Sequence, residues 1–297
     1  MGMRDQQLFI SNTRQRVSQL IGTGIWEGVD GSRVNDWFRQ FEEADCALLG
    51  ACLLDNLTYR SKQQVLALFK AALTTSQLLS SDTSSDLMII EALRGRRDPG
   101  IRLIPVISPD QPPTKSGPYM LRLLSRGLRI REKWMVWTSE LGSVPENVHS
   151  VIAVDDFCGS GKQFVERFLA LPEVAEFRRC RPECKFIYVA AAAHRDGIGS
   201  IREAAQDVEI VSGEILSTEH HFFDGTVLNQ YQSDGLKAAL LDQHDRMLAQ
   251  VHLNGSVGKF GFGSLGLTYA FAHGTPNNTL PVLWYDNTDG WTSLLDR

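Results

Sequence analysis

Two adjacent carboxylates and a glycine-rich turn follow one another near the middle of the chain. Residues 151–163 read Val-Ile-Ala-Val-Asp-Asp-Phe-Cys-Gly-Ser-Gly-Lys-Gln, so Asp155 and Asp156 come directly after four apolar residues. The backbone N–H groups of Gly159–Gly161 can bind an anion, and the helix expected next adds its positive dipole end. Carboxylates repel a bare phosphate, but they accept hydrogen bonds from hydroxyl groups and they bind Mg2+. The segment therefore predicts a site for a sugar phosphate.

A nucleotide-binding P-loop is the nearest alternative for this segment. That motif has the form Gly-x-x-x-x-Gly-Lys-[Ser/Thr], in which the hydroxyl binds magnesium. With Gly161 and Lys162 in their places, the first glycine falls at Asp156 and the hydroxyl at Gln163. Two defining positions are therefore wrong, and we exclude a P-loop.

The apolar run followed by Asp-Asp-x-x-Gly-Ser-Gly resembles the phosphoribosyl-pyrophosphate-binding motif of type I phosphoribosyltransferases. That family carries threonines around the loop glycine, where this chain has Ser160 and Gln163. The resemblance implies that Asp155 and Asp156 are catalytic residues that hold the ribose 2′ and 3′ hydroxyls and, through the ligand, the cofactor Mg2+. It also implies a 5′-phosphate loop made of Phe157, Cys158, Gly159, Ser160, Gly161, Lys162 and Gln163.

A second candidate anion site lies upstream, between residues 109 and 117. This segment follows the first strand expected in the sheet and contains three prolines before Lys115, Ser116 and Gly117. In type I phosphoribosyltransferases, the loop after the first sheet strand of this region binds pyrophosphate. By that resemblance, Lys115 and the N–H groups of Ser116 and Gly117 are candidate pyrophosphate ligands. A proline-stiffened surface turn is an equally consistent interpretation.

Three further segments occur in order along the chain: Arg33–Phe41, Lys115–Gly117 and His273–Trp284. With the acidic pair, they are similar to a phosphoribosyltransferase-like family of bacterial conflict systems, proposed effectors of anti-phage defence that include retron-type loci. The similarity covers about residues 25–297. It implies a toxic effector with defence-system protein partners, and it adds candidates for base binding in a segment that also fits an Asn-rich turn. These candidates are His273, Thr275, Asn277 and Asn278.

Two interpretations of the function follow from these motifs. In the first, the protein is an enzyme that binds phosphoribosyl pyrophosphate or a nucleotide and transfers the phosphoribosyl group or cleaves an N-glycosidic bond. The protein would then position the reactants and stabilise the leaving pyrophosphate, with help from Mg2+. In the second, the site is catalytically inactive, and the protein senses a sugar phosphate or nucleotide or binds a partner. A second anion site facing Asp155 at a pyrophosphate distance would favour the enzyme.

Other sites find weaker support in the sequence. The neighbouring His220 and His221 point in different directions on most backbones, so they make a poor metal site. Cys180 and Cys184 have one ligand spacing but no second pair to complete a zinc site. No Gly-x-Ser-x-Gly segment is present, so a serine-hydrolase nucleophile is not expected.

Cysteine usage and hydropathy predict a cytoplasmic protein without a membrane partner. The five cysteines are an odd number scattered along the chain, which favours reduced thiols. No apolar stretch approaches the length of a membrane span, and the first residues lack a signal-peptide pattern.

Nucleic-acid binding stays open at this level. The formal net charge of −5 gives no attraction of the whole molecule toward a polyanion. Two basic runs nevertheless occur at residues 94–97 and 122–133. Solvated helix faces are the favoured interpretation of such runs, and a local basic patch is the other.

The spacing of apolar residues predicts two regions of different architecture. Over about residues 8–95 the pattern is helical, as in Val34, Trp37 and Phe41 after a candidate cap at Ser32. The Arg-Gly-Arg-Arg-Asp-Pro-Gly stretch at 94–100 predicts a junction. We therefore expect an N-terminal helical layer at residues 1–95 and a phosphoribosyltransferase-like domain at residues 96–297.

Strands and helices alternate after the junction, which predicts an α/β fold with a mainly parallel sheet. By the resemblance, this sheet is of the phosphoribosyltransferase type. Strands are expected at 102–107, 133–137, 148–154, 185–192, 208–215 and 266–272. Helices are expected at 117–126, 162–171, 196–205 and 234–252.

Overall fold

The computed structural model describes residues 3–75, 88–108, 112, 115–231, 235–253, 257–286 and 290–297. The chain divides into two compact units. Unit 1 comprises Met1–Gln63 with Ser217–Arg297, and unit 2 comprises Gln64–Leu216. The boundary expected between residues 95 and 96 thus falls inside unit 2. One hydrophobic core contains residues from both ends of the chain, which places the C-terminal segment with the N-terminal helices.

Unit 2 is built on a four-stranded sheet in the order β2-β3-β4-β5, and every neighbouring pair is parallel. Its β2 and β4 are buried along almost their whole length, which explains their continuous apolar sequence. The predicted α/β fold with a parallel sheet is therefore confirmed. The strands are β2 (Ile101–Pro105), β3 (Ser150–Cys158), β4 (Lys185–His194) and β5 (Val208–Leu216).

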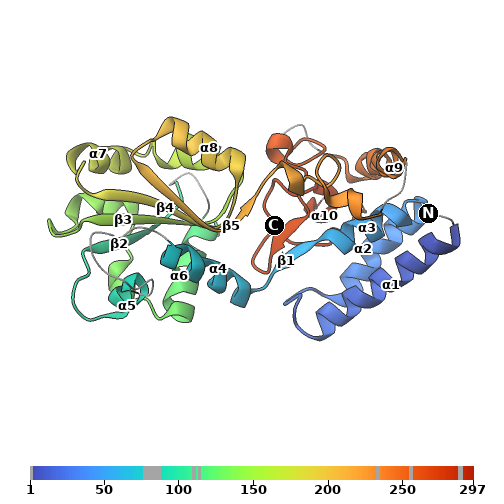
Figure 1. Ribbon diagram of the computed structural model, residues 1–297, viewed down its shortest axis with the longest axis horizontal. Helices are drawn as coiled ribbons and strands as arrows, with labels where there is room; N and C mark the ends of the chain where they lie inside the picture. The colour runs from blue at the N-terminus through green and yellow to red at the C-terminus, as the bar shows by residue number, and fades with distance from the viewer. Residues whose placement is uncertain are drawn as a thin grey trace. The chain divides into compact units, whose positions relative to one another are not determined.

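Helices cover both faces of this sheet (Figure 1). On one face lie α7 (Pro172–Cys180) and α8 (Arg195–Ala204). On the other lie α4 (Lys62–Thr75), α5 (Met88–Arg94) and α6 (Ser116–Leu128). The buried side chains of β3 and β4 fill the layers between sheet and helices, which gives unit 2 a core of its own.

Between β2 and β3 the chain passes first to one side of β2 and then to the other. After α6, the chain returns beside the outer edge of β2, where Met135 forms an isolated parallel bridge with Leu103. It then passes through η2 (Thr138–Ser143), which packs against α7, and enters β3 on the other side of β2. In open α/β sheets, ligands bind beyond the carboxyl ends of the strands at such a switch point. The fold therefore marks the carboxyl ends of β2 and β3 as the place for a site.

Several predicted elements differ in detail from the structure. The strand predicted at 133–137 is wrong: the helical turn η1 (Glu132–Trp134) occupies its first half, and an isolated bridge joins Met135 to Leu103 of β2. The helix predicted at 162–171 is a short π-helix, η3 (Gln163–Phe168), and α7 was not predicted. The strand predicted at 148–154 continues to Cys158, because β4 pairs with it as far as Ala193.

Unit 1 is mainly helical. Trp37 and Phe41 of α2 are fully buried, and Trp37 Nε1 donates a 2.8 Å hydrogen bond to the carbonyl of Val282. The side chain of Asp30, rather than the expected Ser32, accepts the capping hydrogen bond at the start of α2. The main elements are α1 (Met3–Gly22), α2 (Gly31–Glu43), α3 (Ala47–Asn56), α9 (Leu236–Val251), α10 (Pro281–Trp284) and the parallel pair β1 (Thr58–Arg60) and β6 (Tyr269–Phe271). Short 3-10 turns are η4 (Thr218–His220), η5 (Val227–Tyr231) and η6 (Phe262–Ser264).

Candidate functional site

The acidic pair lies in β3 just beyond the point where its neighbour β2 ends. Pro105, the last residue of β2, is in register with Val154. The N–H of Val106 donates to the carbonyl of Val154 at 3.0 Å, after which β2 leaves the sheet. Asp155 and Asp156 are the next two residues of β3, while β4 continues on their other side. The pair is thus located at the switch point of the sheet.

Asp155 is buried and bonded within the protein. The residue is only 4% exposed, and its Oδ2 accepts a 3.0 Å hydrogen bond from the hydroxyl of Tyr188. Its Oδ1 accepts a 3.0 Å hydrogen bond from the N–H of Asp156. Burial raises the pKa of Asp155 well above its ordinary value, and the neighbouring Asp156 adds to the effect. The raised pKa favours the neutral form of Asp155. Its hydrogen bond from the N–H of Asp156 holds the backbone of that residue in place.

Asp156 is the more accessible of the two acids. It is half-buried, and its Oδ1 accepts hydrogen bonds from the N–H of Phe157 at 2.9 Å and from Ser116 Oγ at 2.7 Å. Ser116 is the first residue of α6, so this contact joins the end of β3 to the segment that follows β2. The two sequence segments predicted to bind ribose and pyrophosphate therefore meet here.

The start of α6 packs closely against the chain that leaves β2. A Cβ atom at Gly117 would lie 2.8 Å from the carbonyl oxygen of Val106, so only glycine allows this approach. Lys115 precedes the helix in an extended conformation and is half-buried. The first N–H groups of this helix and its positive dipole end are suited to an anion. Of the predicted loop, residues 109–111 and 113–114 lie outside the described residues.

The glycine turn is held against the start of α8. Gly161 has a φ of 76°, and a Cβ at Gly197 would lie 2.3 Å from the carbonyl oxygen of Gly159. The positive φ of Gly161 and the close approach at Gly197 both require glycine. These two glycines fix the position of the turn Gly159–Gly161. Ser160 is half-buried, and the following Lys162 and Gln163 are exposed.

Phe157 and Cys158 of the predicted phosphate loop belong to β3 instead, because β4 pairs with them. The Cys158 thiol is buried, and burial raises its pKa to about 12, with a further contribution from Asp155. A thiolate is the nucleophilic form of cysteine, so this residue is not suited to nucleophilic chemistry. The turn after the strand begins at Gly159, and phosphate binding by residues 157–163 stays a prediction.

The candidates for base binding lie in unit 1. Thr275 and Asn278 are buried, and each bonds to the protein itself: Thr275 Oγ1 donates to the carbonyl of Asp296 at 2.7 Å. Asn278 Nδ2 donates to the carbonyl of Phe262 at 2.8 Å. His273 and Asn277 are half-buried. The acidic pair belongs to unit 2, so base binding by these four residues stays a prediction.

Comparison with known proteins supplies the family. A sequence model of the PRTase-CE family matches residues 34–297. The chain belongs to the PRTase-CE family. It is therefore a phosphoribosyltransferase-like protein, in agreement with the motif at Asp155 and Asp156. Neither the search of curated proteins nor that of solved structures returned a match.

Binding of Mg2+ at the site of this PRTase-CE protein stays a prediction. Among the described residues, no three His, Cys, Asp or Glu side chains come together as a metal cluster. Magnesium is commonly held by one or two carboxylates together with phosphate oxygens of a substrate. The half-buried Asp156 is the residue that would hold the ion in this way.

Within the described part of the chain, no helix combines the length and the apolar character of a membrane span.

Tyr188 contacts the candidate site and was not among the residues predicted from the sequence. It is fully buried in β4, where its hydroxyl needs a hydrogen-bond partner and finds Asp155. The signal was present: a single tyrosine interrupts the otherwise apolar stretch Phe186–Ala193. A buried hydroxyl one strand away from an acidic pair predicts a contact between them once the strands are known to be adjacent.

Proposed function

We propose that this PRTase-CE protein binds phosphoribosyl pyrophosphate, or a nucleotide with the same sugar phosphate, above the carboxyl ends of β2 and β3. The observation that carries the proposal is the 2.7 Å hydrogen bond from Ser116 Oγ to Asp156. It joins one accessible carboxylate to the start of α6, close to the glycine turn that follows β3. Hydroxyl groups and two phosphate groups are the ligand features that such a combination can bind.

The chemistry proposed for this site is displacement at the anomeric carbon of the ribose. Asp156 would accept a hydrogen bond from a ribose hydroxyl, and Gly159–Gly161 would donate N–H groups to the 5′-phosphate. Lys115 and the first N–H groups of α6 would stabilise the charge that develops on the leaving pyrophosphate. Bound Mg2+ would supply further neutralisation of that charge. A base, nucleotide or macromolecule is the acceptor class.

We further propose that the protein acts through this reaction as a toxic effector in anti-phage defence, with defence-system proteins as partners. This proposal depends on the resemblance of the segments at 33–41, 115–117 and 273–284. The test is phage challenge of bacteria that carry the gene in its native locus, either as the wild type or with the Asp156→Asn substitution. Equal protection by the two genes would contradict an effector role for this site.

A catalytically inactive sensor is the second candidate function. The observation in its favour is that both side-chain oxygens of Asp155 have hydrogen-bond partners inside the protein. One accessible acid then remains where the transferases of this type use two. Such a protein would bind the sugar phosphate and transmit the bound state to a partner without transfer.

Calorimetric titration with phosphoribosyl pyrophosphate and Mg2+ tests the binding proposal. Wild-type protein is expected to bind, and Asp156→Asn is expected to lose at least tenfold in affinity. Asp207→Asn is the matched control, since Asp207 is an exposed acid of the same unit that pairs with Arg178. No binding by folded wild-type protein, or equal loss in both variants, would contradict the proposal. Release of pyrophosphate on addition of bases or nucleotides would then separate the enzyme from the sensor.

A further inference from the structure

The two basic runs of the sequence form one surface in unit 2. Arg131 Nε donates to the carbonyl of Arg94 at 3.0 Å, and Lys133 Nζ donates to the carbonyl of Arg96 at 2.7 Å. Arg94 Nε donates in turn to the carbonyl of Leu128 at 2.7 Å. The segment after α5 therefore lies beside the end of α6. We define the basic surface by its eight residues, which are Arg94, Arg96, Arg97, Arg122, Arg126, Arg129, Arg131 and Lys133.

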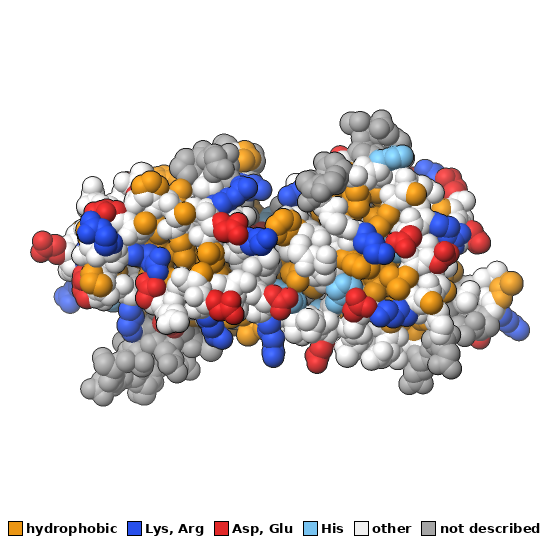
Figure 2. Space-filling model, turned by 90° about the horizontal axis from the view of Figure 1, so that it is seen from above, with side chains coloured by type: hydrophobic (Ala, Val, Ile, Leu, Met, Phe, Trp, Pro, Cys, Tyr) orange, Lys and Arg blue, Asp and Glu red, His pale blue; other side chains and the backbone are white. Residues whose placement is uncertain are grey.

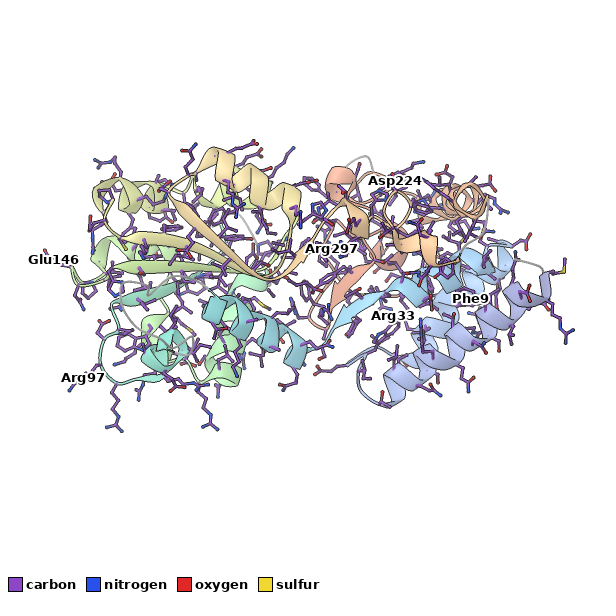
Figure 3. All side chains as sticks on the ribbon, viewed as in Figure 1. Phe9, Arg33, Arg97, Glu146, Asp224 and Arg297 are labelled. Atoms are coloured by element: carbon purple, nitrogen blue, oxygen red, sulfur yellow. The ribbon has the colours of Figure 1, made fainter. Side chains whose placement is uncertain are left out.

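The basic surface is open to solvent, although Arg94, Arg131 and Lys133 also donate hydrogen bonds within the protein. Seven of the eight residues are exposed, and Arg131 is half-buried. Arg122 and Arg126 are one helical turn apart on α6 and both face solvent. The surface lies on the face of the sheet opposite to α7 and α8 (Figure 1). Figure 3 places Arg97 on this side of unit 2, next to α5.

The charge of this surface departs from that of the whole protein. Residues 91–98 and 119–133 together contain eight Arg or Lys and three Asp or Glu, whereas the chain as a whole has a formal net charge of −5. Two of these acids have partners: Glu91 pairs with Arg94, and Asp98 pairs with the buried Arg102. By contrast, Figure 2 shows basic and acidic side chains interspersed over unit 2 on the side of α7 and α8. The positive charge is therefore concentrated over α5 and α6.

The composition of the surface favours phosphate groups over other anionic partners. Seven of the eight cations are arginines, whose planar guanidinium groups bind phosphate oxygens in a bidentate manner. Protein interfaces usually contain large apolar anchors, and membrane-bound surfaces insert them into the lipid. The exposed large hydrophobic side chains of the described residues all lie outside residues 91–98 and 119–133. A polymer with regularly spaced phosphates fits a surface of this kind.

We propose that the basic surface binds the phosphate backbone of a nucleic acid without reading its base sequence. Such binding follows from the release of counterions when arginine and lysine neutralise phosphates, and it weakens steeply with salt. This inference does not depend on the proposed sugar-phosphate site, which uses the opposite end of α6. A helix of 13 residues is about 20 Å long, so the same helix connects a small-ligand site to a polymer-binding surface.

Fluorescence anisotropy with labelled 20-nucleotide probes tests the inference. Single-stranded RNA, single-stranded DNA and duplex DNA of mixed sequence are titrated with the full chain between 50 and 200 mM NaCl. Wild-type protein is expected to bind at least one probe, with an affinity that falls linearly in a logarithmic plot against salt. The variant R96Q/R97Q/R122Q/R126Q is expected to lose at least tenfold in affinity at 100 mM NaCl. Its salt slope is expected to fall by about one for each phosphate contact removed.

A variant with Arg39→Gln and Arg179→Gln is the control for loss of positive charge elsewhere, because both side chains are exposed and lie outside the basic surface. It removes two charges, whereas the test variant removes four. It is expected to keep the wild-type salt slope and most of the affinity. Thermal unfolding and titration with phosphoribosyl pyrophosphate check that the four-residue variant is folded and that its other site is unchanged. No binding of any probe at 50 mM NaCl would overturn the inference. So would unchanged binding by the four-residue variant, or binding to anionic vesicles in place of the probes.

Discussion

Ser116 Oγ and Asp156 Oδ1 are 2.7 Å apart, although the two residues are 40 positions apart in the sequence. The contact exists because α6 starts directly above the end of β2, where Gly117 lies against Val106. Since β3 extends beyond β2, its acidic pair faces the first turn of this helix. A ligand that binds both segments would therefore find them already joined before it arrives, which reduces the conformational entropy lost on binding.

Removal of the Ser116 hydroxyl is expected to weaken ligand binding without unfolding the protein. A hydrogen bond to a charged group contributes about 1.5–3 kcal/mol, and Ser116→Ala removes one of the hydrogen bonds that orient Asp156. We expect an affinity for phosphoribosyl pyrophosphate about tenfold lower, measured by calorimetry. Ser125→Ala is the control on the same helix, because Ser125 bonds to the exposed Glu132. A full-affinity Ser116→Ala variant would show that the orientation of Asp156 does not matter.

The buried pair Asp155 and Tyr188 predicts a particular dependence of stability on pH. The pKa of Asp155 is raised in the folded state by burial, so the folded protein binds this proton more tightly than the unfolded chain does. Its contribution to stability is then complete below the unfolded pKa of about 3.9 and is lost as the pH rises toward the folded pKa. Asp155→Asn cannot ionise and should lack this decline. Urea unfolding of both proteins between pH 4.5 and 8 compares the slopes, and parallel curves would contradict a raised pKa.

The hydroxyl of Tyr188 is expected to stabilise the fold through the same contact. Tyr188→Phe leaves Oδ2 of Asp155 without its donor, and an unsatisfied buried polar group costs about 1–3 kcal/mol. We expect a free energy of unfolding lower by that amount at pH 7. In the background of Asp155→Asn, the effect of Tyr188→Phe should change, since contacting residues are not additive. Additive effects in this double-mutant cycle would show that the two side chains are not coupled.

The sequence predicted the parallel sheet because buried strands leave long apolar runs, as in Phe186–Ala193. It predicted the acidic pair because two carboxylates beside glycines are an unusual local pattern. The limits of β3 were missed because pairing with β4, a contact between distant segments, decides where the strand ends. For the same reason, no local pattern distinguishes the buried Asp155 from the accessible Asp156. The two side chains point to opposite faces of β3, and packing between segments far apart in the sequence buries the face of Asp155, where Tyr188 of the neighbouring strand bonds to it.

Close packing of the glycine turn on α8 predicts a sharp contrast between two glycines of that helix. A Cβ at Gly197 would lie 2.3 Å from the carbonyl oxygen of Gly159, whereas a Cβ at Gly199 would meet no atom within 4 Å. Gly197→Ala must displace the turn, with a loss of about 1–3 kcal/mol in stability and of measurable ligand affinity. Gly199→Ala should be neutral or stabilising by about 0.5–1 kcal/mol, since alanine favours the helix. Thermal unfolding and calorimetry of the pair provide the test, and similar behaviour of the two variants would contradict this packing.

In unit 1, the buried ring of His244 is expected to make the stability of the folded protein sensitive to acid. The ring is fully buried next to Phe223 and Phe260, with centroids 5.0 and 5.8 Å away, and burial lowers its pKa to about 4. A lowered pKa means that its contribution to stability is complete above the unfolded pKa of about 6.5 and is lost as the pH falls toward 4. The corresponding loss is on the order of 3 kcal/mol. His244→Phe should remove this part of the acid dependence in urea unfolding, whereas His252→Asn, at an exposed position, should retain it. Wild-type acid sensitivity in His244→Phe would assign the effect to other groups.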